Sequence, residues 1–484
     1  MNRAIPRARA VLGEQVRWSL LALPTGVAFV ALLAAVATRL GLLVQATALA
    51  AALLFFLVGL RWPLVLLFAL VALIPVEEAG VIGDLGTLSK AVGILFAVSY
   101  ALPRLGRLRM RAMPGAGWAY LGWALASWAW ALSPDVAVRE LSTLVQLFLV
   151  AVLVADVVVH DPSIVRRLLW VYSLSATVTA CLGLAAYVGG AAGSRVAALP
   201  GQDPAQYAAL LLPAFVFSLN ELLRRHRPLF AGPIALLVTT GIILSGTRSA
   251  WVSAVFIVAV AIIPRLRLRQ RLAAVLVILA IVLVAVQIPG VTSLIAQRTD
   301  SALATGGAGR TDIWAVGLQI IASAPIAGVG YANFPVAYTP KLIAATGVQS
   351  YLEPASGPHN VVIGTTGELG IIGLIVLALF LLPLILRRGW GPDASVVQEI
   401  LMSLMVSALF LDILSNRKQV WLAIGLAAGL AYRAHHASED ASRMKESGPH
   451  EKAEHNVDLS VDSDGGDNPR RRRLVLLGNP GQGE

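Results

Sequence analysis

Long apolar runs follow one another through most of the 484 residues, and short polar connections separate them. The chain is 57% hydrophobic and only 13% charged, so a soluble domain of this length could not keep its surface polar. The runs do not alternate polar with apolar residues, as the strands of a membrane barrel do; residues 50–58, for example, read AAALLFFLV. The sequence therefore predicts an all-α fold, a polytopic helical membrane protein.

The apolar runs predict about 12–14 transmembrane helices. The N-terminal arginines resemble the basic region of a signal peptide, but span after span follows, so we expect the first helix to be retained. The runs 63–76 and 88–103 are short for a crossing, and twelve spans remain if this pair does not cross. The predicted spans are 19–37, 40–60, 63–76, 88–103, 117–132, 141–159, 168–188, 206–220, 229–245, 249–263, 272–288, 359–386, 396–414 and 417–433.

Arginine residues indicate the orientation of the chain, because their clusters fall in every second connection. The positive-inside rule assigns these connections to the cytoplasm. Both termini are then cytoplasmic, the turn at Arg248 and residues 289–358 face outward, and we expect a multi-pass membrane protein. The net charge of +11 is distributed as topology requires, so it does not indicate nucleic-acid binding. The clusters lie at positions 104, 107, 109 and 111, at 166 and 167, at 224, 225 and 227, at 265, 267, 269 and 271, and at 387 and 388.

Composition divides the chain into four parts. Residues 1–288 are expected to form an N-terminal transmembrane bundle, residues 289–358 a periplasmic loop, and residues 359–433 the C-terminal transmembrane helices. Residues 434–484 are too polar to bury a core and are expected to be a disordered cytoplasmic tail.

The long outward loop is expected to be ordered and to contain short amphipathic helices. Gly306–Gly309 are expected to form a flexible segment before the first amphipathic helix, and Ala324-Pro325 ends that helix. A second short segment continues to about Thr346, which gives a two-helix cap over the outward face. The apolar residues on one face of the first helix predict that it lies along the membrane. These residues are Ile313, Val316, Ile320 and Ile321.

Three side chains on the outward face could carry chemistry. Arg248 ends the turn Ser245-Gly-Thr, where backbone N–H groups and hydroxyls can form an anion site, and its planar guanidinium suits phosphate. Arg310 precedes the amphipathic helix, where an arginine is also common without a function. His359 opens an apolar helix at the membrane surface, where a neutral imidazole could accept a proton from a hydroxyl. Snorkelling of Arg248 and an ordinary polar contact of His359 are the structural alternatives.

The sequence shows no set of residues that would hold a cofactor or a metal. Cys181 is the single cysteine, which excludes an internal disulfide and a cysteine-based metal site. Glu77, Glu78 and Asp84 share an outward connection but lack the spacing of metal ligands. The outer face of a membrane also has no nucleotide supply. We therefore expect no cofactor, and a substrate that arrives already activated on a lipid.

Four motifs resemble those of the superfamily of O-antigen ligases and Wzy-type O-antigen polymerases, which are bacterial surface-polysaccharide enzymes. They occur in the family's order over roughly residues 229–415 and include its long periplasmic loop. The motifs are Ser245-Gly-Thr-Arg248-Ser-Ala-Trp251, Gly309-Arg310-x3-Trp314, Pro325-x2-Gly328-x-Gly330-x2-Asn333-Phe334 and His359-Asn360-x7-Glu368-x-Gly370-x2-Gly373.

The resemblance implies a transferase that passes a glycan from undecaprenyl pyrophosphate to a hydroxyl without metal or nucleotide. Arg248 and Arg310 match the family's arginines that bind the donor pyrophosphate. His359 matches the histidine proposed to activate the acceptor hydroxyl. Asp412 lies where the family often has an aspartate, which could orient an arginine or the histidine.

Three further residues of the motifs are given lesser roles. Asn360 and Ser245 are expected to support the site. Glu368 lies about two and a half turns beyond His359 on the opposite helical face, so it is expected to be a buried partner of another span.

The leading interpretation is a ligase that joins a lipid-linked O-antigen to a lipid A–core acceptor, with inversion at the sugar. A polymerase would use the same residues with a second lipid-linked glycan as acceptor. A membrane transporter is the alternative of another class, and it predicts broken or charged helices at mid-membrane depth. The expected partners are an undecaprenyl pyrophosphate-linked glycan, a glycan acceptor and membrane lipid.

Overall fold

The computed structural model describes residues 58–59, 61–77, 87–191, 195–199, 202–224, 227–287, 290–304, 310–346, 357–386 and 391–446. The regular elements of these residues are helices, which confirms the all-α class. The chain divides into two compact units, residues 1–434 and residues 435–484. The predicted spans 19–37 and 40–60 lie outside the described residues, except for residues 58–59.

Each of the other predicted spans corresponds to a helix, sometimes with a short helical extension. α5 continues into a 3-10 turn at Ser127–Trp130, and α10 continues into a π-helical turn at Val258–Ile262. Before the predicted loop the helices are α3 (Pro63–Leu73), α4 (Leu88–Ala101), α5 (Gly115–Ala126), α6 (Pro134–His160), α7 (Ile164–Ala186), α8 (Pro204–Leu223), α9 (Pro228–Leu244), α10 (Arg248–Ile257) and α11 (Leu268–Val286). From the loop onward they are α12 (Val291–Ala304), α13 (Arg310–Ser323), α14 (Phe334–Ala337), α15 (Pro340–Ala345), α16 (Val361–Leu386), α17 (Pro392–Ala408) and α18 (Lys418–Glu446).

Four helices within the described residues are both long and apolar enough to cross a membrane. They are α6, α7 with the helical turn that continues it to Gly190, α8 and α16. α3, α9 and α10 are shorter apolar helices. On α16, exposed apolar side chains recur three or four residues apart and form one lipid-facing stripe. These side chains are Ile371, Ile375, Leu379, Leu382 and Leu386. The fold is that of a polytopic helical membrane protein, as the sequence predicts, while the total of 12–14 crossings stays a prediction.

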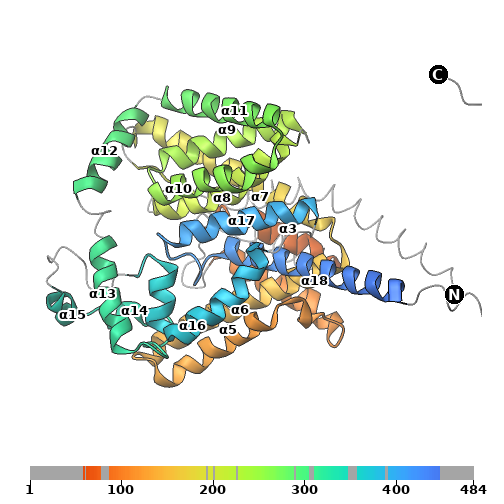
Figure 1. The fold of residues 1–484 in the computed structure, drawn as a ribbon, viewed down its shortest axis with the longest axis vertical. Helices are drawn as coiled ribbons and strands as arrows, with labels where there is room; N and C mark the ends of the chain where they lie inside the picture. Colours follow the sequence, from red (N-terminus) through yellow and green to blue (C-terminus); the bar gives the residue numbers. More distant parts are fainter. Residues whose placement is uncertain are drawn as a thin grey trace, which may run out of the picture. The chain divides into compact units, whose positions relative to one another are not determined.

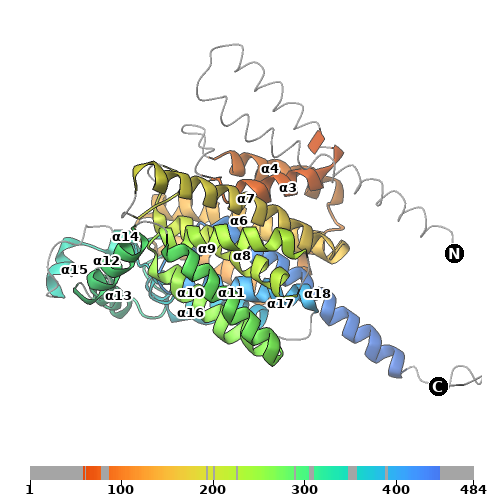
Figure 2. The same ribbon diagram turned by 90° about the horizontal axis from the view of Figure 1, so that it is seen from above.

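Helices from before and after the loop pack together. α16 packs along α5, and α17 packs against both α8 and α10. α7, α8 and α9 pack against one another, and α3 joins them through α7. Both views place α12–α15 beyond the same end of these helices (Figure 1, Figure 2). The loop therefore meets helices from both halves of the sequence at one end of the bundle.

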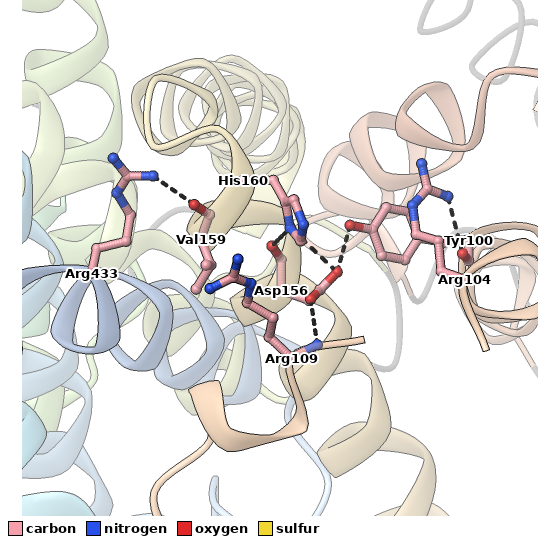
Figure 3. Close-up of polar contacts among 7 residues, drawn as sticks. All are labelled: Tyr100, Arg104, Arg109, Asp156, Val159, His160 and Arg433. Carbon is pink, nitrogen blue, oxygen red and sulfur yellow. Dashed lines mark hydrogen bonds and ion pairs between the residues drawn. The ribbon is translucent and has the colours of Figure 1, made fainter. Parts of the chain in front are cut away.

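The two ends of α6 contact different parts of the chain. At its start, Ser133 donates its backbone N–H to the side chain of Asn333 at 2.6 Å. Near its end, Asp156 accepts hydrogen bonds from the hydroxyl of Tyr100 and the backbone N–H of Arg109, both at 2.8 Å (Figure 3). At the rise of an α-helix these contacts lie roughly 35 Å apart. The loop and the arginine-rich connection are thus at opposite ends of α6, the arrangement that the arginine pattern predicts.

The loop has a small hydrophobic core of its own. Most of the predicted apolar face of α13 is buried in it, while Ile321 is half-buried. α14 and α15 form the second segment that the sequence predicts. The loop also contains α12, so the prediction of two helices is wrong in number. The buried residues of this core are Ile313, Val316, Ile320, Val329, Phe334, Tyr338 and Ile343.

α16 is interrupted at Gly370, whose φ of 69° and ψ of −173° lie outside the helical region. An interrupted helix leaves N–H and C=O groups without partners, and an apolar surrounding makes this costly. Residues 325–330 of the loop and one indole supply the partners. The bonds are Val329 N–H to Gly367 O (3.0 Å), Gly330 N–H to Glu368 O (2.9 Å), Ile371 N–H to Pro325 O (2.9 Å) and Trp123 Nε1–H to Leu369 O (2.9 Å).

The contact between residues 325–330 and α16 explains why Gly328 and Gly370 are glycines, and it shows the role of Glu368. The Glu368 carboxylate accepts hydrogen bonds from the backbone N–H groups of Ala332 and Phe334. Its partner is therefore the loop backbone, and the expectation that it pairs with another span is wrong. A Cβ at Gly328 would lie 2.3 Å from the carbonyl of Glu368, so the two segments approach too closely for a side chain.

Gly370→Ala is expected to lower the free energy of unfolding by at least about 1–3 kcal/mol, the scale of backbone strain at such a φ. The added Cβ would also lie only 1.9 Å from the carbonyl oxygen of Ile326. Thermal unfolding in detergent measures the effect. Gly122→Ala is the matched control, because Gly122 is helical and a Cβ there would meet no atom within 4 Å. Equal unfolding midpoints for the two variants would contradict the role given to the break.

The last helix ends later than the sequence predicts. α18 runs to Glu446, beyond the boundary expected at residue 433. Polar residues extend it because a charged, exposed helical turn needs no core when it continues an existing helix. Residues 447–484, the rest of the predicted tail, lie outside the described residues.

Candidate active site

A cavity of about 280 Å³ lies where α10 and α13 begin. The structure brings Arg248 and Arg310 together at this cavity, although α11 and α12 separate them in the sequence. The residues that line it are Arg248, Ser249 and Val252 from α10, Arg310, Thr311 and Trp314 from α13, and Phe410, which follows α17.

α10 and α13 present the same pattern to the cavity. Each helix begins with an arginine, which a hydroxyl residue follows. The first N–H groups of a helix lack intrahelical partners and carry partial positive charge. The buried hydroxyl of Ser249 has no hydrogen-bond partner among the described residues. Two helix starts, two guanidinium groups and these hydroxyls favour an anion with several oxygen atoms, such as a pyrophosphate.

Hydrogen bonds inside the turn before α10 hold Arg248 in place. Ser245 Oγ donates to the carbonyl of Ile242 at 2.7 Å and accepts the N–H of Thr247 at 3.1 Å. Gly246 has a φ of 60°, a conformation that glycine adopts readily. Ser245 is fully buried and does not line the cavity, so it positions Arg248 and its hydroxyl does not face the anion.

Arg195 is a further basic residue at this turn, which the sequence reasoning does not single out. Its guanidinium donates to the carbonyl of Ser245 at 3.3 Å and to Oγ1 of Thr247 at 3.4 Å. Burial lowers the pKa of Arg195. The negative charge of Asp203 raises this pKa, and the positive charge of Arg248 lowers it further. The position of Arg195 in a predicted outward connection, where arginines are disfavoured, is the same signal that marks Arg248.

Asn360 fixes the junction between the loop and α16. Its Oδ1 accepts backbone N–H groups of the first turn of α16 at 2.8 and 3.0 Å, as a helix cap does. Its Nδ2 donates to the carbonyl of Leu409, just after α17, at 3.0 Å. His359 precedes it with a φ of 45°, a left-handed conformation. Asn360 thus holds His359 beside the segment that carries Asp412.

His359 lies before α16 begins, outside the membrane-spanning helix. Burial lowers the pKa of its imidazole, and the positive charge of Arg310 acts in the same direction. Asp412 and Asp203 act in the opposite direction. A lowered pKa favours the neutral imidazole, which is the form that can accept a proton. Asp412 itself accepts a hydrogen bond from the hydroxyl of Ser415 at 3.0 Å.

The residues singled out by the sequence thus form one connected region. Arg248 and Arg310 line the cavity. Arg310 and Asp412 lie close enough to His359 to influence its charge. Asn360 holds the backbone at the start of α16, and Ser245 holds the backbone of the turn before α10. Their roles in a reaction remain predictions.

Residues 233–378 match the family model described as O-Antigen ligase. The match contains the turn before α10, the loop and the start of α16. It supports a role in glycan transfer during O-antigen processing. No curated protein matches the chain.

Proposed function

We propose that this protein, a member of the O-antigen ligase superfamily, transfers a glycan from undecaprenyl pyrophosphate to a hydroxyl acceptor without a metal ion. The acceptor in this proposal is lipid A–core, which makes the reaction an O-antigen ligation. The observation that carries the proposal is the cavity shared by Arg248 and Arg310 at the starts of two helices.

The reaction breaks the bond between C1 of the first sugar and the pyrophosphate oxygen. Undecaprenyl pyrophosphate leaves with the bonding electrons, and Arg248 and Arg310 stabilise the negative charge that develops on it. The two helix starts add partial positive charge at the same place. The placement of both arginines at one cavity supports this role.

A new bond forms between C1 and the acceptor oxygen, and His359 takes the proton of the acceptor hydroxyl. The lowered pKa of the imidazole supports this step, because a base must be deprotonated before it acts. Asp412 stabilises the imidazolium that results. The acceptor attacks the face opposite the leaving group, so the configuration at C1 is inverted.

We further propose that the protein is in the bacterial inner membrane and that this region faces the periplasm. The positive-inside rule supports this orientation, because the arginine-rich connection at Arg109 and the loop contact at Asn333 lie at opposite ends of α6. The donor pyrophosphate is then at the depth of the lipid headgroups, and the polyprenyl chain lies among the helices.

Purified protein, given a glycan on undecaprenyl pyrophosphate and lipid A–core, is expected to form the joined product with EDTA present and without nucleotide. The two arginines supply the positive charge, and the pyrophosphate linkage supplies the driving force. Electrophoresis of the lipid products measures transfer, and the Arg248→Ala variant is the inactive control.

The products separate the alternatives. A single glycan joined to lipid A–core supports the ligase, whereas longer lipid-linked chains formed without that acceptor identify a polymerase. Turnover that requires a divalent cation contradicts the two-arginine mechanism. Solute uptake into proteoliposomes without transfer would identify a transporter. The broken helix that a transporter predicts is present in α16, but protein backbone occupies the break and satisfies its polar groups.

A further inference from the structure

A second cavity, of about 420 Å³, lies among α3, α4, α6 and the start of α18. One side of it is apolar and is formed by membrane helices, with Leu70, Ile94 and Leu149 among its residues. The other side is polar and carries four basic and two acidic side chains. The basic residues are Lys90, Arg139, Arg417 and Lys418, and the acidic residues are Glu77 and Glu140.

The polar side of this cavity has an excess of positive charge. Lys418 forms an ion pair with Glu77. Lys90 and Arg417 also lie close enough to Lys418 for their charges to repel it. α4 and α18 begin at this side, α6 contributes Arg139 from its second turn, and the start of a helix carries partial positive charge. Basic side chains gathered at two helix starts favour an anionic ligand.

Two donors in the cavity lack protein partners. Gln419 is only 3% exposed, and its Nε2 has no hydrogen-bond partner among the described residues. The Nε of Arg417 is buried and lacks one as well. Buried donors of native proteins are nearly always hydrogen-bonded, because leaving one unpaired is costly. Both residues line the cavity, so they add unpaired polar groups to its basic side.

The connection between α17 and α18 joins this cavity to the candidate active site. Phe410 lines the first cavity, and Asn416 and Arg417 line the second. Asp412 lies between them, close enough to both His359 and Arg417 to interact with their charges. The segment from Phe410 to Arg417 therefore runs from one cavity to the other, with Asp412 between its ends.

We propose that the second cavity binds the acceptor, a membrane glycolipid that carries a phosphate group next to its apolar chains. The apolar helices contact the chains, and the basic residues with Gln419 bind the phosphate. The donor pyrophosphate occupies the first cavity, so the two substrates meet at His359 and Asp412. This assignment of the acceptor rests on the proposed function, whereas the binding of a phosphorylated lipid does not.

Direct binding tests the lipid site without the reaction. The probes are phosphorylated lipid A, the same lipid after enzymatic removal of its phosphates, and inorganic phosphate. Protein in detergent is expected to bind the phosphorylated lipid at least about tenfold more tightly than either of the others, since one charge-assisted hydrogen bond is worth that much. If both lipids bind equally, the phosphate site is wrong. If inorganic phosphate binds as tightly as the phosphorylated lipid, the apolar side does not contribute to binding.

Lys90→Gln combined with Arg139→Gln is the test variant, because both side chains are exposed and their loss leaves the core intact. It is expected to lose most of the preference for the phosphorylated lipid. Arg269→Gln, an exposed arginine that does not line the cavity, is the matched control and should bind as the unchanged protein does. An undiminished preference for the phosphorylated lipid in the test variant overturns the proposal.

Kinetics of transfer test the link to the reaction. The Lys90→Gln, Arg139→Gln variant is expected to raise KM for the acceptor about tenfold and to leave KM for the donor unchanged. A raised KM for the donor alone overturns the assignment of the acceptor. If no transfer occurs with any variant while lipid binding follows the pattern above, the proposed function fails and the lipid site stands.

Discussion

Replacing His359 by asparagine reduces the rate of glycan transfer by about 10²–10⁴-fold, the scale for loss of a general base. Asparagine is the preferred variant because His359 has a φ of 45°, and asparagine tolerates the left-handed conformation better than most residues. Its amide cannot accept a proton at physiological pH. The measurement is single-turnover transfer by purified protein, together with the amount of protein in the membrane.

The His359→Ala variant is expected to lose activity to the same extent and to be somewhat less stable, because alanine is strained at this φ. Near-normal transfer by either variant would remove His359 from the reaction. Loss of the protein from the membrane, in place of loss of rate, would indicate a structural role.

The dependence of the rate on pH tests the base by a second route. Burial and the charge of Arg310 lower the pKa of the imidazole from its ordinary value of 6.5. A base acts when deprotonated, so the rate rises with pH and levels off, with a midpoint below 6.5. Asp412→Asn removes a negative charge that favours the protonated form, so it moves this midpoint to lower pH. A midpoint above 6.5 in the unchanged protein, or an upward shift in the variant, contradicts the assignment.

Arg248→Lys and Arg310→Lys are each expected to lower the rate of transfer by about 10²–10³-fold, as the removal of one donor to a developing charge does elsewhere. Lysine keeps the positive charge but cannot form the two parallel hydrogen bonds of a guanidinium with a phosphate group. Arg269→Lys is the matched control, because Arg269 is exposed and does not line the first cavity.

The two arginine variants also test whether both residues act on one group. Combined, they are expected to lose less than the product of the single effects, because both arginines stabilise the same pyrophosphate. Multiplicative losses would indicate separate ligands. Full activity of Arg248→Lys would show that charge alone is needed at that position, and the role in phosphate binding would then be wrong.

The class of fold and most residues of the candidate site could be predicted from the sequence. Only helices and closed barrels satisfy their backbone in a membrane, and apolar runs without alternation exclude the barrel, so the sequence sufficed for the all-α class. The face of Ile313, Val316 and Ile320 followed from helical periodicity, and the structure buries it. Arg248 stood out because a basic residue is unusual in an outward turn, and Arg310 because it matches a motif of the family. The structure brings both to one cavity.

Which distant segments of the chain meet could not be predicted from the sequence. Periodicity describes one helix at a time, so it could not show that residues 325–330 fill the break in α16 or that Glu368 binds the loop backbone. Arg195 lies in a predicted outward connection, as Arg248 does, but its hydrogen bonds to the turn before α10 are seen only in the structure. The second cavity could not be predicted for the same reason, because its basic residues come from α4, α6 and the start of α18, and only packing places them together.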